Sequence, residues 1–153
     1  MADKYDPLRL ANQLCFPLYA CSKEIVKAYK PYLEELDLTY TQYITMMVMW
    51  EHKELCVKDV GRYLYLDSGT LTPLLKRLEE KGYITRRRSE KDERDLIVKI
   101  TEIGEALKEK AADIPQKVGS CVDLDPQKAQ MLYDILYEIL GKITDLERSS
   151  NSK

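Results

Sequence analysis

Residues 67–82 read DSGTLTPLLKRLEEKG, and this stretch decides the fold. Asp67 or Ser68 can cap the start of a helix, because a short polar side chain accepts a hydrogen bond from an unpaired backbone N–H. Gly82 suits the position just after a helix, where the backbone needs a positive φ. The leucines that recur at the spacing of one helix face are Leu71, Leu74, Leu75 and Leu78. The stretch therefore predicts an amphipathic helix over residues 68–81.

The segments on either side of this helix predict a helix-turn-helix followed by a wing. A short helix is expected over residues 57–64, and after Gly82 the period changes to the alternation of a β-strand. Strands are predicted at 83–87 and 96–100, and a highly charged tip joins them. A winged helix-turn-helix places its second helix in the major groove of DNA and its wing on the backbone or in the minor groove. The helix pair alone fits a capped amphipathic helix without a DNA-binding role equally well.

The N-terminal third is predicted to form two helices. The first is expected over residues 8–32, with a kink or a local break near Pro17, because proline lacks the N–H that a helix interior needs. A turn or a short helix is expected immediately after it. The start of the second helix is marked by a capping box, in which Thr39 and Gln42 each accept a hydrogen bond from the other's backbone N–H.

Two further helices are predicted in the C-terminal third. The first spans about residues 101–118, and residues 118–123 are expected to form the loop after it. The second begins with Asp125 as its N-cap and Pro126 as its first residue. Its wide apolar stripe comprises Leu132, Ile135, Leu136, Ile139, Leu140 and Ile143. The predicted fold class is mainly α with a small β-hairpin: a winged helix-turn-helix plus a helical dimerisation region from both chain ends.

Charge is unevenly distributed along the chain. The 153 residues carry 24 Lys and Arg against 26 Asp and Glu, so the formal charge is only −2. Residues 58–94 nevertheless hold ten basic and seven acidic side chains, which makes this segment +3 and the rest of the chain −5. A charge run is often only a solvated face. However, the hairpin carries arginines of the kind that enter a narrow minor groove of DNA. They are Arg86, Arg87 and Arg88 at its base and Arg94 near its tip.

Composition and motifs exclude several classes of protein. Hydrophobic residues make up 44% of the chain and charged residues 33%, which is typical of a globular domain. The longest uncharged apolar stretch, residues 44–50, is too short to cross a bilayer, and no apolar signal core is visible, so we expect a cytoplasmic location. The single histidine, His52, and the absence of a Cys-x2-Cys pair argue against a metal site, and we expect no cofactor. Without a Gly-rich phosphate loop or an acid–base histidine, an enzyme such as a thiol peroxidase is not favoured.

Four cysteines and eleven tyrosines are candidates for chemistry. The cysteines are Cys15, Cys21, Cys56 and Cys121. In a reducing cytoplasm we expect no structural disulfide between them. From the residues alone, Cys15 fits a buried small hydrophobe better than a reactive thiol. Tyrosine hydroxyls need hydrogen-bond partners when buried, so some of the eleven are expected to face a specific group.

Motifs spread over nearly the whole chain resemble a known family. The motifs that resemble the MarR family of dimeric repressors are residues 67–79, Gly82-Tyr83-Ile84, the wing motif Asp92-Glu93-Arg94, and Thr101-Glu102-Ile103-Gly104. The motifs similar to the OhrR branch, which senses organic hydroperoxides, are Leu14-Cys15-Phe16, Tyr19, Tyr29 and residues 38–43.

The resemblance implies a dimeric DNA-binding repressor. Residues 54–100 would form the winged helix-turn-helix, and residues 8–35 and 102–147 the dimerisation part, of a single subunit spanning 1–153. The partners would be a second copy and double-stranded DNA with a near-palindromic operator, read by two recognition helices about 10 bp apart. The residues implied to contact DNA or to support the wing are Ser68, Thr70, Thr72, Lys76, Arg77, Arg86, Asp92 and Arg94.

The resemblance also implies a redox switch at Cys15. Tyr29 and Tyr40 of the partner subunit would bond its sulfur, with Tyr19 nearby, and an organic hydroperoxide would oxidise it to a sulfenic acid. The dimer would then repack and release its operator. Cys121 would act as the resolving thiol in an intersubunit disulfide, unless a small thiol takes that part.

A second interpretation shares the same fold. A MarR-type repressor can instead be released by a small ligand, for example a phenolic compound, bound between the dimerisation and DNA-binding parts without cysteine chemistry. The wing and the recognition helix fit both interpretations equally, and the dependence of release on Cys15 distinguishes them. In either case Cys21 and Cys56 are expected to be packing residues.

Overall fold

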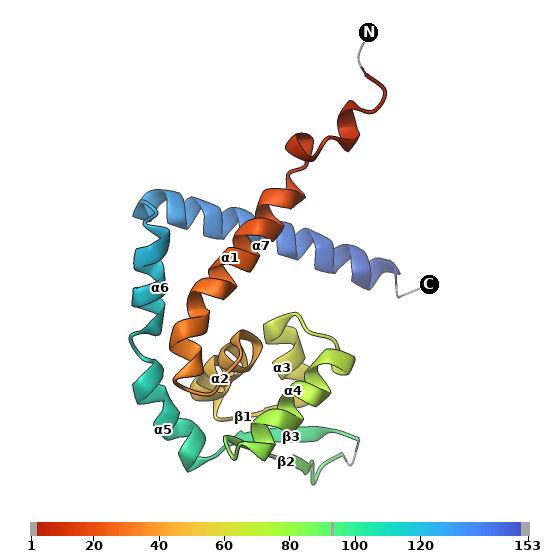
Figure 1. The fold of residues 1–153 in the computed structure, drawn as a ribbon. Helices are drawn as coiled ribbons and strands as arrows, with labels where there is room; N and C mark the ends of the chain where they lie inside the picture. The colour runs from red at the N-terminus through yellow and green to blue at the C-terminus, as the bar shows by residue number, and fades with distance from the viewer. Residues whose placement is uncertain (1–2, 93, 151–153) are drawn as a thin grey trace. The chain divides into compact units, whose positions relative to one another are not determined.

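The computed structural model describes residues 3–92 and 94–150, so Glu93 of the predicted wing motif lies outside the described residues. The chain forms two compact units, Met1–Val118 and Gly119–Lys153. After two short 3-10 turns, the helices and strands are α1 (Cys15–Glu34), α2 (Tyr40–His52), β1 (Glu54–Cys56), α3 (Val57–Leu64), α4 (Ser68–Glu80), β2 (Ile84–Arg88), β3 (Leu96–Ile100), α5 (Glu102–Ala111), α6 (Ile114–Val122) and α7 (Pro126–Ser150) (Figure 1). In the part of the chain that is described, no helix has the length and apolar character needed to cross a membrane.

A single hydrophobic core holds the first unit together. Its side chains come from α1 to α5, from the sheet and from the start of α6, and the most deeply buried include Met46, Met49, Val60 and Val98. The predicted stripe of α4 lies entirely in this core: Leu71, Leu74, Leu75 and Leu78. Because burial of these leucines fixes the rotation of α4, its opposite face is left to solvent.

The wing belongs to a three-stranded antiparallel sheet in the order β1-β3-β2 (Figure 1). β2 and β3 form the predicted hairpin, with Arg86 opposite Val98. The sequence prediction misses β1, because a strand of three residues is too short to show a recognisable alternation. β1 pairs with the edge of β3 that β2 leaves free, and its Leu55 lies opposite Val98. β3 is therefore the central strand. The fold class, mainly α with a small sheet, is confirmed.

The helices that carry the candidate functional side chains begin with the predicted caps. Thr39 N–H donates to Gln42 Oε1 at 3.0 Å and Gln42 N–H donates to Thr39 Oγ1 at 3.3 Å, which is the capping box of α2. The backbone N–H of Thr70 donates to Asp67 Oδ1 at 2.9 Å, and this hydrogen bond lowers the pKa of the Asp67 carboxyl. Gly82, at φ 77°, follows α4 as predicted.

The first helix begins and ends later than predicted. α1 begins at Cys15, and Pro17 lies in its first turn, where a backbone N–H has no helical partner to lose. Pro31 lies inside α1, which continues to Glu34, and the predicted turn follows at residues 35–37, slightly later than expected. Burial of Leu33 in the core holds the last turn of α1 in place despite the hydrogen bond that proline removes.

The helix predicted over residues 101–118 is divided into two. α5 ends at Ala111 and α6 begins at Ile114. Pro115 explains the interruption, because it has no N–H to donate to the carbonyl of Ala111 and its ring would collide with that carbonyl in a continuous helix.

The connection between α6 and α7 is shorter than predicted. The loop predicted over residues 118–123 is wrong for most of its length, because α6 continues past Cys121, which lies in its last turn. The low helix propensity of its glycine and serine is a weak effect that the surrounding residues override. α7 begins with the predicted cap, since the backbone N–H groups of Gln127 and Lys128 donate to Asp125 Oδ1 at 3.0 and 3.2 Å.

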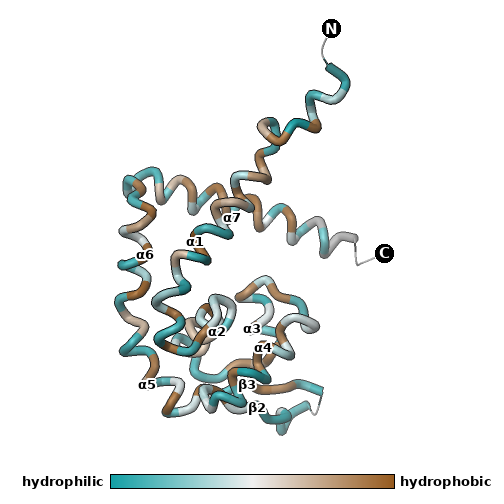
Figure 2. The backbone as a smooth tube through the Cα atoms, in the orientation of Figure 1, coloured by the Kyte–Doolittle hydropathy of each residue, from teal (hydrophilic) through white to brown (hydrophobic). Residues whose placement is uncertain are grey.

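α7 leaves half of its predicted apolar stripe exposed in the single chain, and the other half, Leu136, Ile139 and Leu140, is half-buried. Figure 2 shows hydrophobic and hydrophilic residues alternating along this helix. Its exposed large apolar side chains are Met131, Leu132, Tyr133, Ile135, Tyr137 and Ile143. An apolar surface of this extent is typical of an interface rather than of a solvent-facing helix.

Candidate functional site

α4 separates its side chains by polarity. The residues of this helix predicted to contact DNA are all exposed: Ser68, Thr70, Thr72, Lys76 and Arg77. Thr70 Oγ1 donates to Asp67 Oδ2 at 3.0 Å and Thr72 Oγ1 donates to the carbonyl of Ser68 at 2.8 Å. Both hydroxyls therefore keep only their capacity to accept a hydrogen bond. Lys76 and Arg77 form no ion pair within the described part of the chain, so their positive charges are available to an anion.

The wing holds one arginine outward. Arg94 donates from Nε to Asp92 Oδ1 at 3.1 Å and from a terminal nitrogen to Asp92 Oδ2 at 3.0 Å, and its side chain is 89% exposed. The hydrogen bonds from Arg94 lower the pKa of the Asp92 carboxyl, so the pair persists to a lower pH than an ordinary aspartate would allow. The geometry is the one expected for a wing arginine that its neighbouring aspartate orients. Its contact with DNA stays a prediction.

Two ion pairs attach the wing to the helices behind it. Arg86 on β2 donates from Nε and a terminal nitrogen to Glu79 Oε2 at 3.0 and 2.8 Å, and its backbone N–H donates to Glu79 Oε1 at 2.9 Å. These bonds lower the pKa of the Glu79 carboxyl. Lys58 at the start of α3 pairs with Asp95 beside β3 at 2.7 Å. Arg86 therefore lies where the predicted wing support needs it.

Cys15 is exposed at the first residue of α1. Exposed apolar side chains flank it, with Leu14 73% and Phe16 42% exposed. Tyr19, which is 62% exposed, follows one helical turn later on the same face, as the prediction of a nearby tyrosine requires. Tyr29 lies fourteen residues further along α1, roughly 21 Å along the helix axis at 1.5 Å per residue. One chain therefore does not bring Cys15 to its own Tyr29.

Tyr29, Tyr40 and Tyr43 form a cluster of tilted rings. The ring centroid of Tyr29 lies 5.1 Å from that of Tyr40 and 5.7 Å from that of Tyr43. Burial raises the pKa of all three, and that of Tyr43 to about 12. The phenols therefore hold their protons to a higher pH than exposed tyrosines do. Among the described residues the hydroxyls of Tyr29 and Tyr40 make no hydrogen bond, so both remain available as donors.

Replacing Tyr43 by phenylalanine is expected to reduce the loss of stability at alkaline pH. The folded protein holds the Tyr43 proton between pH 10 and about 12, where an unfolded tyrosine has released it. This contribution is complete below pH 10 and is lost as the pH rises through 12. A rise from 10 to about 12 amounts to roughly 3 kcal/mol at about 1.36 kcal/mol per pKa unit. Urea unfolding on either side of pH 10 should therefore show a smaller decline for Tyr43→Phe than for Tyr63→Phe, which changes an exposed ring.

The other cysteines lie apart from this arrangement. Cys121 lies in the second unit and Cys15 in the first, and their pairing stays a prediction. Cys21 is exposed on α1, because no element of the first unit covers that part of the helix, so its predicted packing role is not met within this unit. Cys56 is half-buried at the end of β1. In the described part of the chain no cluster of three His, Cys, Asp or Glu side chains can hold a metal ion.

Comparisons with known proteins agree on one family. Residues 27–111 match the family model described as "Transcriptional regulator SarA/Rot". The organic hydroperoxide resistance transcriptional regulator of Bacillus subtilis is 50% identical over 140 residues, which covers 92% of this chain and 95% of that protein. The solved structure of reduced AbfR of Staphylococcus epidermidis bound to DNA is 34% identical, with a TM-score of 0.75, over 93% of this chain and 99% of that one. A MarR variant from Escherichia coli, solved with operator DNA, has the same fold at 22% identity, with a TM-score of 0.75, over 91% of this chain and 99% of that one.

Proposed function

The chain belongs to the MarR family of winged-helix transcriptional regulators, in the branch of the organic hydroperoxide regulators, and we propose that it is a dimeric repressor that releases its operator when Cys15 is oxidised. It is a DNA-binding, redox-sensing regulator and not an enzyme. One observation carries the proposal that Cys15 is the sensor. The exposed Cys15 thiol lies far along α1 from the hydroxyls of Tyr29 and Tyr40, which make no hydrogen bond in the described part of the chain. A second copy of the chain brings this thiol and these hydroxyls together.

The exposed face of α4 supports major-groove binding. Its start offers the Ser68 hydroxyl as a donor and the Thr70 and Thr72 hydroxyls as acceptors, and its later turns offer the two unpaired cations Lys76 and Arg77. Such groups hold phosphate oxygens and reach base edges. Arg94, held outward by Asp92, suits the adjacent minor groove, because a narrow groove concentrates negative potential.

The exposed apolar surfaces support dimerisation. The N-terminal segment contributes Leu8, Leu10, Leu14 and Phe16, and α7 contributes the stripe described above. A monomer would leave all of these side chains in water, which is unfavourable for a surface of this size. Burial against a second copy removes them from water and places each Cys15 against the other chain's tyrosines.

The chemistry at Cys15 is a two-electron oxidation. The thiolate sulfur attacks the terminal oxygen of the hydroperoxide; an S–O bond forms, the O–O bond breaks, and the alkoxide leaves and takes a proton to become an alcohol. Protonated phenols of the partner stabilise the thiolate by donating hydrogen bonds to it. The sulfenic acid formed then condenses with the thiol of Cys121, which releases water and gives a disulfide. The enlarged, polar sulfur or the new disulfide shifts the dimer away from its DNA-binding arrangement.

Mass spectrometry of the protein after stoichiometric cumene hydroperoxide, combined with DNA binding, tests this proposal. The DNA is a fragment selected from a random pool by the reduced protein, so no operator sequence is assumed. We expect one added oxygen on Cys15, or a disulfide between Cys15 and Cys121, together with loss of binding. Oxidation confined to other residues, or binding that persists after Cys15 is oxidised, contradicts the proposal.

Replacing Arg94 by alanine is expected to weaken DNA binding by about 1–3 kcal/mol and to reduce the slope of log affinity against log salt by about 1. The reason is the loss of a guanidinium that is already oriented toward the groove. Fluorescence anisotropy with the selected DNA over a salt series measures both quantities.

Lys91→Ala is the matched control for this prediction. Lys91 is exposed on the same wing, so its replacement removes the same charge without removing the oriented pair. Equal effects of Arg94→Ala and Lys91→Ala would show that the wing contributes only a diffuse positive charge.

A further inference from the structure

α4 has a proline on its exposed face. Pro73 lies in the second turn of this helix, which nevertheless runs without interruption from Ser68 to Glu80. A proline inside a helix has no N–H, so the carbonyl four residues before it loses its helical donor. That carbonyl belongs to Gly69. Neither the oxidation of Cys15 nor the contacts proposed for the hydroxyls and cations of α4 requires a proline at this position.

The two carbonyls that precede Gly69 are both occupied. The carbonyl of Asp67 accepts the backbone N–H of Leu71 at 2.9 Å. The carbonyl of Ser68 accepts the hydroxyl of Thr72 at 2.8 Å. The carbonyl of Gly69 differs from both, because its own helical donor is missing. A main-chain acceptor without its helical donor is open to water or to a ligand.

Gly69 and Pro73 lie one turn apart on the face of α4 that points away from the core. Both residues are exposed, as is Lys76 one turn further on, whereas the leucine stripe fills the opposite face. Glycine has no side chain that could shield its carbonyl from an approaching group. The Pro73 ring would collide with an undisturbed Gly69 carbonyl, which favours tilting of that carbonyl outward from the helix axis. The exposed face of α4 therefore offers an acceptor next to an apolar ring.

An acceptor beside an apolar ring matches one kind of base pair in the major groove. Adenine presents its N6 amine there as a donor, and its partner thymine presents a C5 methyl group. Cytosine also presents a donor, but its partner guanine presents two acceptors and no methyl group. An acceptor facing the Gly69 carbonyl would leave that carbonyl unsatisfied. An A·T pair therefore suits this part of α4 better than a G·C pair.

We propose that the carbonyl of Gly69 recognises an adenine in each half-site of the DNA. The N6 amine of the adenine donates to the Gly69 carbonyl oxygen, and the Pro73 ring packs on the methyl group of the paired thymine. Pro73 thus acts by removing a competing donor, so the main chain of α4 contributes to sequence specificity together with its side chains. This inference rests on the proposed placement of α4 in the major groove and is independent of the chemistry at Cys15.

Isotope labelling of one peptide group tests the contact directly by NMR. Gly69-Thr70 is the single Gly-Thr pair in the sequence, so labelling glycine carbonyl carbons and threonine nitrogens isolates one signal. With DNA selected by the reduced protein, the Gly69 carbonyl carbon is expected to shift downfield, as a carbonyl does when it accepts a hydrogen bond. The analogue 2-aminopurine pairs with thymine through two hydrogen bonds but has no amine in the major groove. At one A·T position of the half-site it is expected to abolish the shift. A shift that no such substitution reduces overturns the proposal.

Pro73→Ala separates the carbonyl from the rest of the helix. Alanine supplies the missing N–H, which occupies the Gly69 carbonyl, and it favours a helix, so the variant is expected to fold. The 2-aminopurine substitution is expected to weaken binding of the parent by about three- to tenfold and to leave binding of Pro73→Ala nearly unchanged. Because both proteins meet the same duplex, the comparison cancels any effect of the analogue on the DNA itself. If both proteins lose affinity by the same factor, the Gly69 carbonyl does not recognise the adenine.

Two controls isolate the roles of the proline and of the methyl group. Pro31→Ala replaces an exposed proline inside α1 and is expected to keep the discrimination of the parent. Deoxyuridine in place of the paired thymine removes only the methyl group and is expected to weaken binding of the parent by about fourfold. Unchanged affinity with deoxyuridine refutes the packing of Pro73 on that methyl group. Loss of discrimination in Pro31→Ala would show that the effect of Pro73→Ala is not specific to α4, and it too refutes the proposal.

Lys76→Gln distinguishes a failure of this inference from a failure of the proposed function. If Lys76→Gln weakens DNA binding but no analogue distinguishes the parent from Pro73→Ala, α4 occupies the groove and recognition by Gly69 is refuted. If neither Lys76→Gln nor any major-groove analogue changes the affinity, the placement of α4 in the groove is itself wrong.

Discussion

Replacing Gly104 by alanine is expected to lower the free energy of unfolding by about 3 kcal/mol, because the added methyl group has no space. A Cβ at this position would lie 2.1 Å from the carbonyl oxygen of Tyr83. That oxygen is held in place by the backbone N–H of Thr101, which donates to it at 3.0 Å. The carbonyl of Gly104 itself accepts the indole N–H of Trp50 at 2.8 Å in the core, so a displaced backbone loses this bond as well.

Urea unfolding followed by the fluorescence of Trp50, the single tryptophan, measures this effect at a fixed protein concentration. Gly119→Ala is the control, because a Cβ there meets nothing within 4 Å. Alanine in an open helical position is expected to stabilise the protein by about 0.5–1 kcal/mol. If both variants behave alike, the close approach of α5 to Tyr83 does not exist in solution.

Replacing Cys15 by serine is expected to abolish the response to organic hydroperoxide while leaving DNA binding of the reduced protein unchanged. Serine keeps the size of the side chain, but its hydroxyl does not form the nucleophile that breaks an O–O bond. The residues predicted to contact DNA all lie in α4 and the wing, far from the start of α1 along the chain. Anisotropy before and after stoichiometric cumene hydroperoxide measures both properties in one sample.

Cys21→Ser separates the sensor from exposed thiols in general. Cys21 is exposed on the same helix, so it meets the same oxidant, and its replacement is expected to leave the response intact. Cys121→Ser is expected to prevent an intersubunit disulfide and to leave the sulfenic acid on Cys15. If hydroperoxide still releases DNA from Cys15→Ser protein, Cys15 is refuted as the sensor. If hydroperoxide releases DNA from the parent and from Cys21→Ser but not from Cys121→Ser, Cys121 is essential to the response.

Features that depend on a few neighbouring residues are predicted well from the sequence. The caps at Thr39 and Asp67 lie within three residues of the N–H groups they satisfy, so a short stretch of sequence contains the whole interaction. The leucine spacing of α4 also assigns its exposed face, because any residue off the stripe faces solvent. The same holds for Arg94, whose partner is two residues away.

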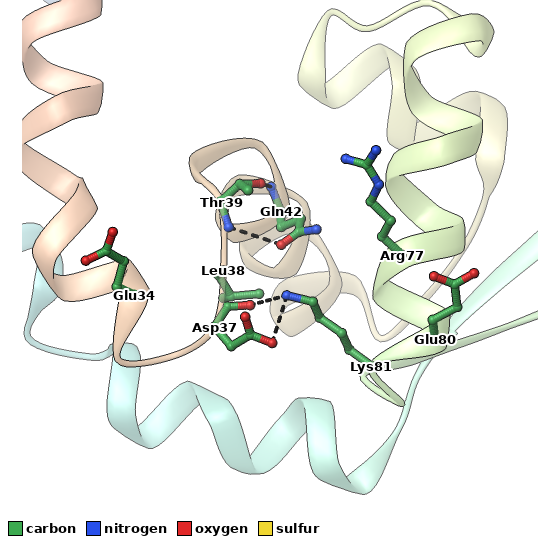
Figure 3. A pocket seen from close by; sticks show the side chains of 8 residues that line it. All are labelled: Glu34, Asp37, Leu38, Thr39, Gln42, Arg77, Glu80 and Lys81. Carbon is green, nitrogen blue, oxygen red and sulfur yellow. Dashed lines mark hydrogen bonds and ion pairs between the residues drawn. The ribbon is translucent and has the colours of Figure 1, made fainter.

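Features that depend on distant partners are not predicted. β1 exists because Leu55 meets Val98, which lies more than forty residues further along the chain. Tyr43 belongs to the tyrosine cluster, but the helical spacing of its segment predicts only that it lies on an apolar face. Its contact with Tyr29 depends on how α1 packs on α2. The cavity lined by Gln42, Arg77 and Lys81 (Figure 3) likewise depends on α4 lying beside the corner between α1 and α2. No pattern in one segment contains this information.

The bonds from Arg86 to Glu79 and from Lys58 to Asp95 have a kinetic consequence. They join the wing to α3 and α4. We therefore expect the minor-groove and major-groove contacts proposed for one subunit to form together and to break together. Variants that cut these bonds should shorten the residence time on DNA more than they slow association, which is where most differences in affinity within one interface arise.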